Sequence, residues 1–517
     1  MRGRVLAVIV TIALSSAGAA AAADVGANDD TGKFASDGGA AFYTAMADLG
    51  LRQTVVTVRW QPSDPLALAQ RPLLDLTVAA ARAAGLRVVF ATYPYPPREL
   101  ETGHPRPEDY SAWLQVLARR YPDVRQFVVG NEPNQPAFWR PQFRGNRQAS
   151  AAAFGPFLAA GYDALKEVDP MITVVGVGLS PRGNDRPVAR SNVSTSPVRF
   201  LAALGAWYRA SGRARPLMDG LSFHPYPNVA TDPLDRGYAW PNAGFVNLDR
   251  IKQAVWDAFS GTPQPTTLDG LRLYLDEVGW QVDTSGAEGY LGTENVRVTD
   301  EASQAAIYGE LLRRASCDPD IAQVNVFGFR DDALRSGFQA GLNRADGTPR
   351  PSAEAVRSVA AMPGCTTAPK LWRPARTVLG AKRPVVRVTA GAIAVELTAG
   401  EAASAHVCLL AGAYTRSSAD RVLEGRSGGA TRCRSTPVVQ ARRTTLWLAR
   451  PAGSATVAVR LEAEANPVRA TIAVRLLLGL GNSLRGRGPT GCPFFLTGRV
   501  LAAVAPFRSP ARHCRQE

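Results

Sequence analysis

The chain has 517 residues, a formal net charge of +15, 46% hydrophobic residues and 20% charged residues. This composition is typical of a folded globular protein and excludes extensive disorder. Outside the N-terminus no apolar run reaches the roughly 18 residues of a membrane-spanning helix, so the sequence predicts no integral membrane protein. The length suits one large barrel with a smaller domain.

The first residues have the order of a secretory signal peptide. A short cationic head at residues 1–4 precedes an apolar stretch at residues 5–14 and small residues ending in three alanines at 21–23. The apolar part is too short for a membrane anchor. We therefore predict a signal peptide over residues 1–23 and a secreted, extracellular protein.

Six cysteines agree with export, because an even number in an oxidising compartment predicts disulfides. They are Cys317, Cys365, Cys408, Cys433, Cys492 and Cys514. Nearness in the sequence favours 317 with 365, 408 with 433 and 492 with 514, although six cysteines allow 15 pairings. No C-x-x-C motif is present, so zinc and redox roles have little support.

From residue 24 to about 363, strand-like apolar runs alternate with helical segments. The predicted strands cover residues 24–27, 53–60, 86–92, 124–130, 171–179, 218–223, 271–276 and 321–327. The predicted helices cover residues 38–49, 72–84, 107–120, 149–168, 197–209, 248–259, 301–315 and 352–361. Eight such units predict an α/β fold, a (β/α)8 TIM barrel, in a domain at residues 24–366. An open doubly wound sheet is the alternative, but it needs a ligand fingerprint at its switch point and this region has none.

The pattern changes after residue 366. Short alternating strands predicted at 385–389, 392–398, 405–410, 444–449, 455–461 and 470–478 indicate an antiparallel β-sandwich domain at residues 380–480. A basic, Cys-containing tail follows at residues 481–517, and we assign it no fold.

The positive charge lies in the C-terminal region. Residues 366–517 contain 23 Lys or Arg and 7 Asp or Glu, whereas residues 1–365 are close to neutral. Such a region suits contact with an acidic polysaccharide or an anionic cell envelope, or it is simply a solvated sandwich surface. Export and the low aromatic content argue against a nucleic-acid partner.

Candidate catalytic groups lie at the carboxyl ends of the predicted strands, where barrels of this kind place their active sites. The fourth strand ends in Gly-Asn-Glu-Pro-Asn; Pro133 lacks an N–H, which ends the strand and leaves Asn131 and Glu132 at the rim. The seventh ends in Asp-Glu-Val-Gly-Trp and places Glu277 at the matching position. Two carboxyls across one pocket suit glycosidic bond cleavage, one as a protonated acid and the other as an ionised nucleophile. The neighbouring Asp276 should point to the opposite side of its strand.

Other rim residues extend this prediction. Asn131 could hydrogen-bond a sugar hydroxyl, and Tyr226 could donate to the nucleophile carboxylate and keep it ionised. His224 could position the acid/base or a sugar hydroxyl, and Arg59 could hold the nucleophile in its charged form. Aromatic residues on predicted rim loops are candidates for stacking on sugars, and Trp280 is included among the substrate-binding residues. These aromatics are Trp60, Tyr93, Tyr95, Trp139, Trp240 and Trp280.

The motifs GNEPN, HPY and EVGW, in this order, resemble those of clan A glycoside hydrolases over residues 24–363. These are retaining (β/α)8 enzymes that include cellulase-like and β-xylosidase-like families. The resemblance implies that Glu132 is the acid/base and Glu277 the nucleophile, and that His224, Tyr226 and Arg59 match family positions.

One feature departs from the family pattern. In many members a Trp at the end of the eighth strand forms the floor of the sugar site. This chain has Phe327, Gly328 and Phe329 there, which puts the preferred sugar in doubt.

The leading prediction is a secreted retaining glycoside hydrolase that acts on a β-linked poly- or oligosaccharide, with no cofactor and no metal. The alternatives are a non-catalytic carbohydrate-binding barrel and an envelope-associated protein in which the barrel is a scaffold. A purely structural interpretation of the two motifs has Asn134 capping a helix and Glu277 as a carboxylate paired with a rim Arg. A calcium site on the loop carboxylates of Asp331 and Asp332 is a further alternative. A G-x-G-x-x-G match at residues 486–491 precedes Cys-Pro rather than a helix, so it predicts no dinucleotide site.

Overall fold

The computed structural model describes residues 23–102, 105–362, 365, 371–376, 381–382, 384–389, 391–411, 431–450, 455–463, 469–470 and 472–478. The predicted signal peptide up to residue 22, the predicted basic tail and the predicted 492–514 disulfide lie outside these residues. The chain divides into two compact units, Met1–Ile251 with Gly261–Leu371, and Lys252–Ser260 with Trp372–Glu517. Within the described ranges, no helix has both the length and the apolar character needed to cross a membrane.

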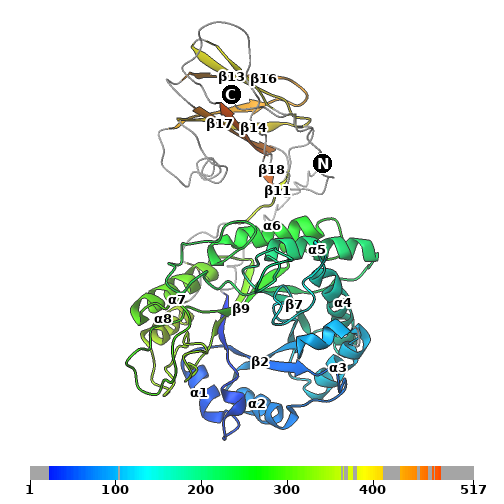
Figure 1. Cartoon of the computed structure of the whole chain (residues 1–517), viewed down its shortest axis with the longest axis vertical. Coiled ribbons are helices and arrows are strands. Elements are labelled where there is room, and N and C mark those ends of the chain that lie inside the picture. Colours follow the sequence, from blue (N-terminus) through cyan, green and yellow to red (C-terminus); the bar gives the residue numbers. More distant parts are fainter. Residues whose placement is uncertain are drawn as a thin grey trace, which may run out of the picture. The chain divides into compact units, whose positions relative to one another are not determined.

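The first unit contains a closed barrel of parallel strands (Figure 1). In chain order these are β1 (Asp24–Asn28), β2 (Gln53–Trp60), β3 (Arg87–Pro94), β4 (Gln126–Val129), β7 (Thr173–Leu179), β8 (Gly220–Phe223), β9 (Arg272–Val278) and β10 (Ile321–Phe327). β1 pairs with both β2 and β10, which closes the ring. The predicted TIM barrel is therefore confirmed, and the open-sheet alternative is wrong.

A helix follows each barrel strand. The helices are α1 (Ala40–Asp48), α2 (Arg71–Ala83), α3 (Pro107–Arg120), α4 (Ser150–Val168), α5 (Pro197–Ser211), α6 (Leu248–Phe259), α7 (Glu301–Ser316) and α8 (Pro351–Ala360). α2, α3, α5 and α8 each carry a proline in the first turn, where the missing N–H has no helical partner to lose. A short hairpin of β5 (Phe143–Arg144) and β6 (Arg147–Gln148) lies between β4 and α4.

The barrel interior has an apolar part and a polar part. Valines of β2, β3, β4 and β7 pack together at its centre, as their β-branched sequences predict. On the β9 and β10 side the interior is polar: Gln53 at the start of β2 donates to Asn325 at 2.9 Å, and Gln323 donates to Asp276 at 2.9 Å. These buried groups are hydrogen-bonded to one another and support the strand ends above them.

The second unit contains two antiparallel sheets around one core. The first sheet is β12 (Val385–Val388), β13 (Ala392–Leu397) and β16 (Thr444–Ala449); the second is β15 (Thr431–Val438), β14 (Ala403–Ala411), β17 (Ala455–Ala463) and β19 (Ile472–Leu478). β11 (Ala375–Arg376) pairs with β18 (Arg469–Ala470). Alternate residues of both sheets, such as Ile393, Val407 and Val457, share a buried core, so the predicted sandwich is confirmed. The sequence pattern missed β15, whose alternation is mostly polar.

Two of the predicted disulfides are present. Cys317 at the end of α7 is bonded to Cys365, and Cys408 on β14 is bonded to Cys433 on β15. Cys408 and Cys433 also lie near His406 in a grouping of possible metal ligands. Because both of these sulfurs are already bonded to each other, that grouping offers no thiolate to a metal.

Gly26 on β1 has no room for a side chain. A Cβ there would lie 2.5 Å from Oδ1 of Asn325 and 2.5 Å from the backbone oxygen of Gln53. Since the backbone of a neighbouring barrel strand cannot move aside, we expect Gly26→Ala to lower the free energy of unfolding by about 1–3 kcal/mol, measured by urea unfolding. Gly309→Ala in α7 is the control, because its Cβ would meet only the Ala355 Cβ at 3.7 Å. It should raise stability by up to about 1 kcal/mol. Equal stability of Gly26→Ala and the unaltered protein would contradict this packing.

Candidate active site

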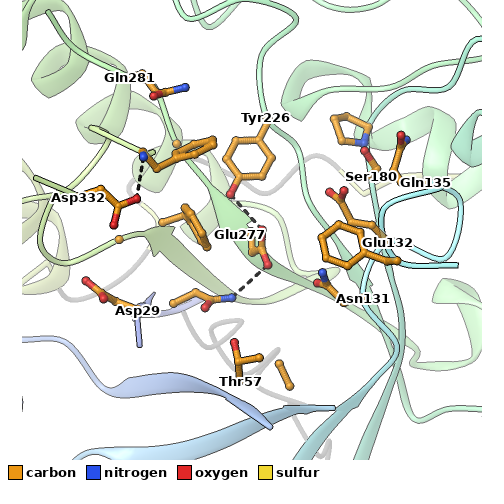
Figure 2. A pocket seen from close by; sticks show the side chains of 18 of the residues that line it. Asp29, Thr57, Asn131, Glu132, Gln135, Ser180, Tyr226, Glu277, Gln281 and Asp332 are labelled. Carbon is orange, nitrogen blue, oxygen red and sulfur yellow. Dashed lines mark hydrogen bonds between the residues drawn. The ribbon is translucent and has the colours of Figure 1, made fainter. Parts of the chain in front are cut away.

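A cavity of about 1010 Å³ opens at the carboxyl ends of the barrel strands. Five of the predicted site residues line it, namely Arg59, Asn131, Glu132, Tyr226 and Glu277. Figure 2 shows Glu132 and Glu277 extending into the same space, with Tyr226 beside Glu277. Barrel closure thus brings together two carboxyls that are 145 positions apart in the sequence.

Glu277 is held by hydrogen bonds to both of its carboxylate oxygens. Tyr226 donates from its hydroxyl to Oε2 at 3.0 Å, as predicted, and Asn28 donates from Nδ2 to Oε1 at 3.3 Å (Figure 2). Burial raises the pKa of Glu277, and the charge of His224 and the Tyr226 hydrogen bond oppose that rise. Asn28 is not among the site residues predicted from the sequence. Only its position beside β10 at the end of β1 indicates that role, and that position depends on the strand pairing.

A β-bulge lets two consecutive residues of β9 face the inside of the barrel. Val324 pairs with Leu275 and Val326 pairs with Val278, so Asp276 and Glu277 together lie opposite a single residue of β10. Asp276 is buried below the cavity and accepts from Gln323 and Asn325, while Glu277 lines the cavity. The predicted orientation of Asp276 to the opposite side of the strand is therefore wrong, because strict alternation fails at a bulge.

Glu132 lies in a tight turn directly after β4. Its φ of 42° is in the left-handed region, which costs a residue with a side chain about 1–3 kcal/mol. The turn is held by the Glu132 N–H, which donates to Gly178 O at 2.7 Å, and by the buried Asn134 side chain, which donates to Ser180 O and Thr195 O. Asn134 therefore fixes the turn and caps no helix.

His224 lies between the two glutamates. Its Nδ1 is 3.2 Å from Oε1 of Glu132 and 3.6 Å from Oε2 of Glu277, so these two oxygens are at most about 6.8 Å apart. The imidazole is 1% exposed. Burial lowers its pKa, but the two carboxylates outweigh burial and raise the pKa of His224 to about 9. His224 is therefore protonated at neutral pH and lies within ion-pairing distance of both glutamates.

Arg59 and Trp280 are placed differently from their predicted roles. Arg59 lines the cavity, but its Nε donates to the Tyr93 hydroxyl at 3.2 Å and its guanidinium lies 4.6 Å from the Tyr95 ring centroid. No contact among the described residues joins it to Glu277, and His224 supplies the nearby positive charge instead. Trp280 is 2% exposed, donates its indole N–H to Asp232 O, and does not line the cavity, so it cannot contact a sugar there.

Three aromatic rings form one wall of the cavity. Tyr226, Phe327 and Phe338 pack edge to face, with ring centroids 5.1 to 6.2 Å apart. Phe327 ends β10 where the family pattern has its Trp, and Phe338 comes from the following loop. Phe338 could not be found from the sequence, because nothing in that loop indicates which residue turns inward. Of the other predicted aromatics, only Tyr93 lines the cavity.

The candidate calcium carboxylates are engaged by the protein itself. Asp331 is buried and paired with Arg350 at 2.7 Å, and it accepts from the Tyr290 hydroxyl at 2.6 Å. Asp332 accepts from the backbone N–H of Phe338 at 2.8 Å (Figure 2). These contacts account for both side chains as supports of the loop that carries Phe338.

No family model and no curated protein matches the sequence. Solved structures with a similar fold include a family 39 glycoside hydrolase from Bacteroides cellulosilyticus, at 14% identity and a TM-score of 0.45, over 89% of this chain and 79% of that one. A GH5_18 protein from Bifidobacterium longum subsp. infantis has 14% identity and a TM-score of 0.45, over 69% and 81%. The exo-beta-1,4-mannosidase Op5Man5 from Opitutaceae bacterium strain TAV5 has 17% identity and a TM-score of 0.40, over 67% and 60%. These values are too low to carry an argument, so the barrel rests on its own strand pairing.

The shared cation makes a pH-dependent contribution to stability. Because the pKa of His224 rises from 6.5 to about 9 on folding, the contribution is fully present below about pH 6.5 and is lost as the pH rises through 9. We expect His224→Gln to lose about 3 kcal/mol relative to the unaltered protein at pH 6.5 and much less at pH 9.5. Urea unfolding at several pH values measures this.

Selective 15N-histidine labelling gives a direct check. The sequence has four histidines, and His224→Gln identifies the missing resonance. A His224 titration near its ordinary value of 6.5 would contradict the shared-cation geometry.

Proposed function

We propose that the protein is a retaining glycoside hydrolase that cleaves a β-linked poly- or oligosaccharide by double displacement. The observation that carries this proposal is the placement of Glu132 and Glu277 on either side of His224, with oxygens at most about 6.8 Å apart. Retaining enzymes place their carboxyls about 5–5.5 Å apart and inverting enzymes about 6.5–9.5 Å. This upper limit admits the retaining separation and excludes most of the inverting range.

In the first step Oε of Glu277 attacks the anomeric carbon. The bond to the leaving oxygen breaks, and Glu132 gives that oxygen its proton. In the second step Glu132, now ionised, takes a proton from water, and that water displaces Glu277 from the sugar. Tyr226 and Asn28 hold the nucleophile in place. Because both are neutral hydrogen-bond donors, Glu277 keeps its negative charge for the attack.

The surroundings of the two glutamates favour a sugar substrate. The aromatic wall of Tyr226, Phe327 and Phe338 offers apolar rings to the C–H faces of a sugar. Asn131 lines the cavity directly before Glu132, which supports its proposed hydrogen bond to a hydroxyl beside the reacting carbon. Export is part of the same proposal, and two disulfides support an oxidising compartment.

Substitution of each glutamate separates the two roles. Glu277→Ala should reduce hydrolysis of an activated aryl β-glycoside to background. Added azide should restore turnover and give the α-glycosyl azide as product, because azide attacks from the face that the missing carboxylate leaves empty. Glu132→Ala should lose about 10²–10⁴-fold on poor leaving groups but little on activated ones. Azide should then give the β-glycosyl azide. Product stereochemistry is read by proton NMR.

Glu288→Ala is the control for these variants, because Glu288 is an exposed glutamate that does not line the cavity. It should keep the activity of the unaltered protein. Full activity of Glu277→Ala, or an inverted first product from the unaltered protein, would rule out the double displacement. No hydrolysis across a panel of aryl glycosides and polysaccharides would favour a non-catalytic carbohydrate-binding protein.

Tyr226→Phe tests the hydrogen bond on the nucleophile. That hydrogen bond opposes the rise in the pKa of Glu277 that burial causes, so its loss should raise this pKa further. We expect the acid limb of the kcat/KM profile to move to higher pH, and kcat/KM to fall about 10–100-fold at neutral pH, as for a hydrogen bond to a charged group. A lower activity with an unmoved acid limb would show that Tyr226 acts only in packing.

A further inference from the structure

The rim of the barrel carries two arginines on either side of two aromatic rings. Arg59 lies near the end of β2 and Arg182 follows β7, and both line the cavity. Between them along the rim come Tyr93 of β3 and Phe138, which follows β4, because β2, β3, β4 and β7 are neighbours in this order in the barrel. We call this stretch of the rim, formed by Arg59, Tyr93, Phe138 and Arg182, the Glu132 wall.

Contacts between successive residues hold the Glu132 wall together. The Nε of Arg59 donates to the Tyr93 hydroxyl at 3.2 Å, and the Tyr93 ring packs edge to face on Phe138 with the ring centroids 5.7 Å apart. Gln135, in the same turn as Phe138, donates from its side-chain amide to the backbone oxygen of Arg182. The two arginines are therefore fixed at opposite ends of one aromatic surface.

The Glu132 wall lies on the acid/base side of the cavity. Phe138 and Gln135 belong to the segment after β4 that also carries Glu132. Figure 2 shows Gln135 beside Glu132, on the side away from Glu277. In the proposed reaction the acid/base protonates the leaving oxygen, so this wall faces the leaving-group unit of the substrate.

Neither arginine of the Glu132 wall forms an ion pair with a residue that the structure describes. Both are exposed, and Arg182 donates from Nη1 to the backbone oxygen of Asn228 at 2.8 Å. A guanidinium has five N–H groups, so on Arg59 and on Arg182 most of them have no acceptor in the described part of the chain. These groups are available to a ligand.

Neighbouring carboxylates of the cavity have partners of their own. Asp30 pairs with Lys33 at 2.9 Å, and Asp29 accepts from the backbone N–H groups of Phe329 and Arg330 at 2.8 Å. They therefore leave the two guanidinium groups of the Glu132 wall without a counter-charge. Guanidinium groups bind carboxylates and other oxyanions through paired N–H donors, so the wall fits a ring that carries an anionic group.

We propose that the Glu132 wall binds an anionic sugar, one that carries a carboxylate or a sulfate, as the leaving-group unit of the substrate. The sugar ring lies against Phe138, and its anionic group meets Arg59 or Arg182. A neutral sugar would leave both guanidinium groups without an anion. This inference names the substrate class of the proposed glycosidase and therefore rests on that proposed function.

The test compares neutral oligosaccharides with anionic forms of the same chain. The neutral members are β-1,4-linked glucose, β-1,4-linked mannose and β-1,3-linked glucose, and the anionic members carry a carboxylate or a sulfate at C6. Binding is measured by calorimetry on the full chain with Glu277→Ala, so that turnover does not interfere. We expect at least one anionic member to bind about tenfold or more tightly than its neutral counterpart, as for a hydrogen bond to a charged group. The two anionic forms distinguish a carboxylate from a sulfate.

Substitution of the two arginines should remove this preference. Arg59→Gln combined with Arg182→Gln should bind the anionic and neutral members equally, and the single variants show which guanidinium meets the anion. The neutral member should keep its affinity throughout, because a displaced wall would weaken both members alike. Arg186→Gln is the matched control, since Arg186 is an exposed arginine of the same loop as Arg182 and does not line the cavity. It should leave both affinities unchanged.

The outcomes separate this inference from the proposed function. No binding of any member, equal binding of the neutral and anionic members, or a preference that the double variant retains would overturn the inference. Hydrolysis of neutral and anionic members at equal rates would overturn it while the proposed function stands. A preference for anionic members that depends on Arg59 and Arg182, in a protein that hydrolyses none of them, would keep the anionic-sugar site while the proposed function fails.

Discussion

The candidate site depends on one imidazole held between two carboxylates. Glu132 and Glu277 face the same cavity, each with a side-chain exposure of 16%, and the charge of His224 opposes the rise in the pKa of Glu277 that burial causes. At an effective dielectric constant of 20, a pair of charges at 4 Å interacts by about 4 kcal/mol, so the position of His224 favours the ionised form of Glu277. The His224 backbone N–H donates to Leu179 O at 2.9 Å at the end of β8, which fixes the ring between β4 and β9.

This arrangement also explains why the barrel interior is polar on one side. Asp276 is buried beneath the cavity, where the amides of Gln323 and Asn325 donate hydrogen bonds to it, and burial raises its pKa. The bulge that places it there also brings Glu277 into the cavity. The polar residues of β10 are therefore needed because two consecutive residues on the inner side of β9 are acidic, and the buried one requires hydrogen-bond donors.

The sequence predicted the strands, the helices and the two glutamates, because strand ends of a parallel barrel meet at one rim. It could not predict contacts that depend on side-chain reach or on register. Arg59 was expected beside the nucleophile, but the adjacent Tyr93 and Tyr95 take up its guanidinium. Trp280 was expected in the cavity, but the chain turns after Gly279 and the indole meets Asp232 instead. Strict alternation along β9 failed because a bulge is visible only in the pairing of two strands.

The charges of the three central groups bear on the chemistry that the cavity can support. In the proposed first step Glu132 carries a proton and Glu277 is ionised, so with a protonated His224 the three groups carry no net charge. A glycosyl transition state develops positive charge at the anomeric carbon, so the ionised Glu277 stabilises it more than the neutral substrate. Were His224 neutral, the pKa of Glu277 would rise further, because the charge of His224 opposes the rise that burial causes. A buried imidazole with a pKa of about 9 remains charged while Glu132 loses and regains its proton, and this favours an anionic Glu277 before the attack and again when the glycosyl ester is cleaved.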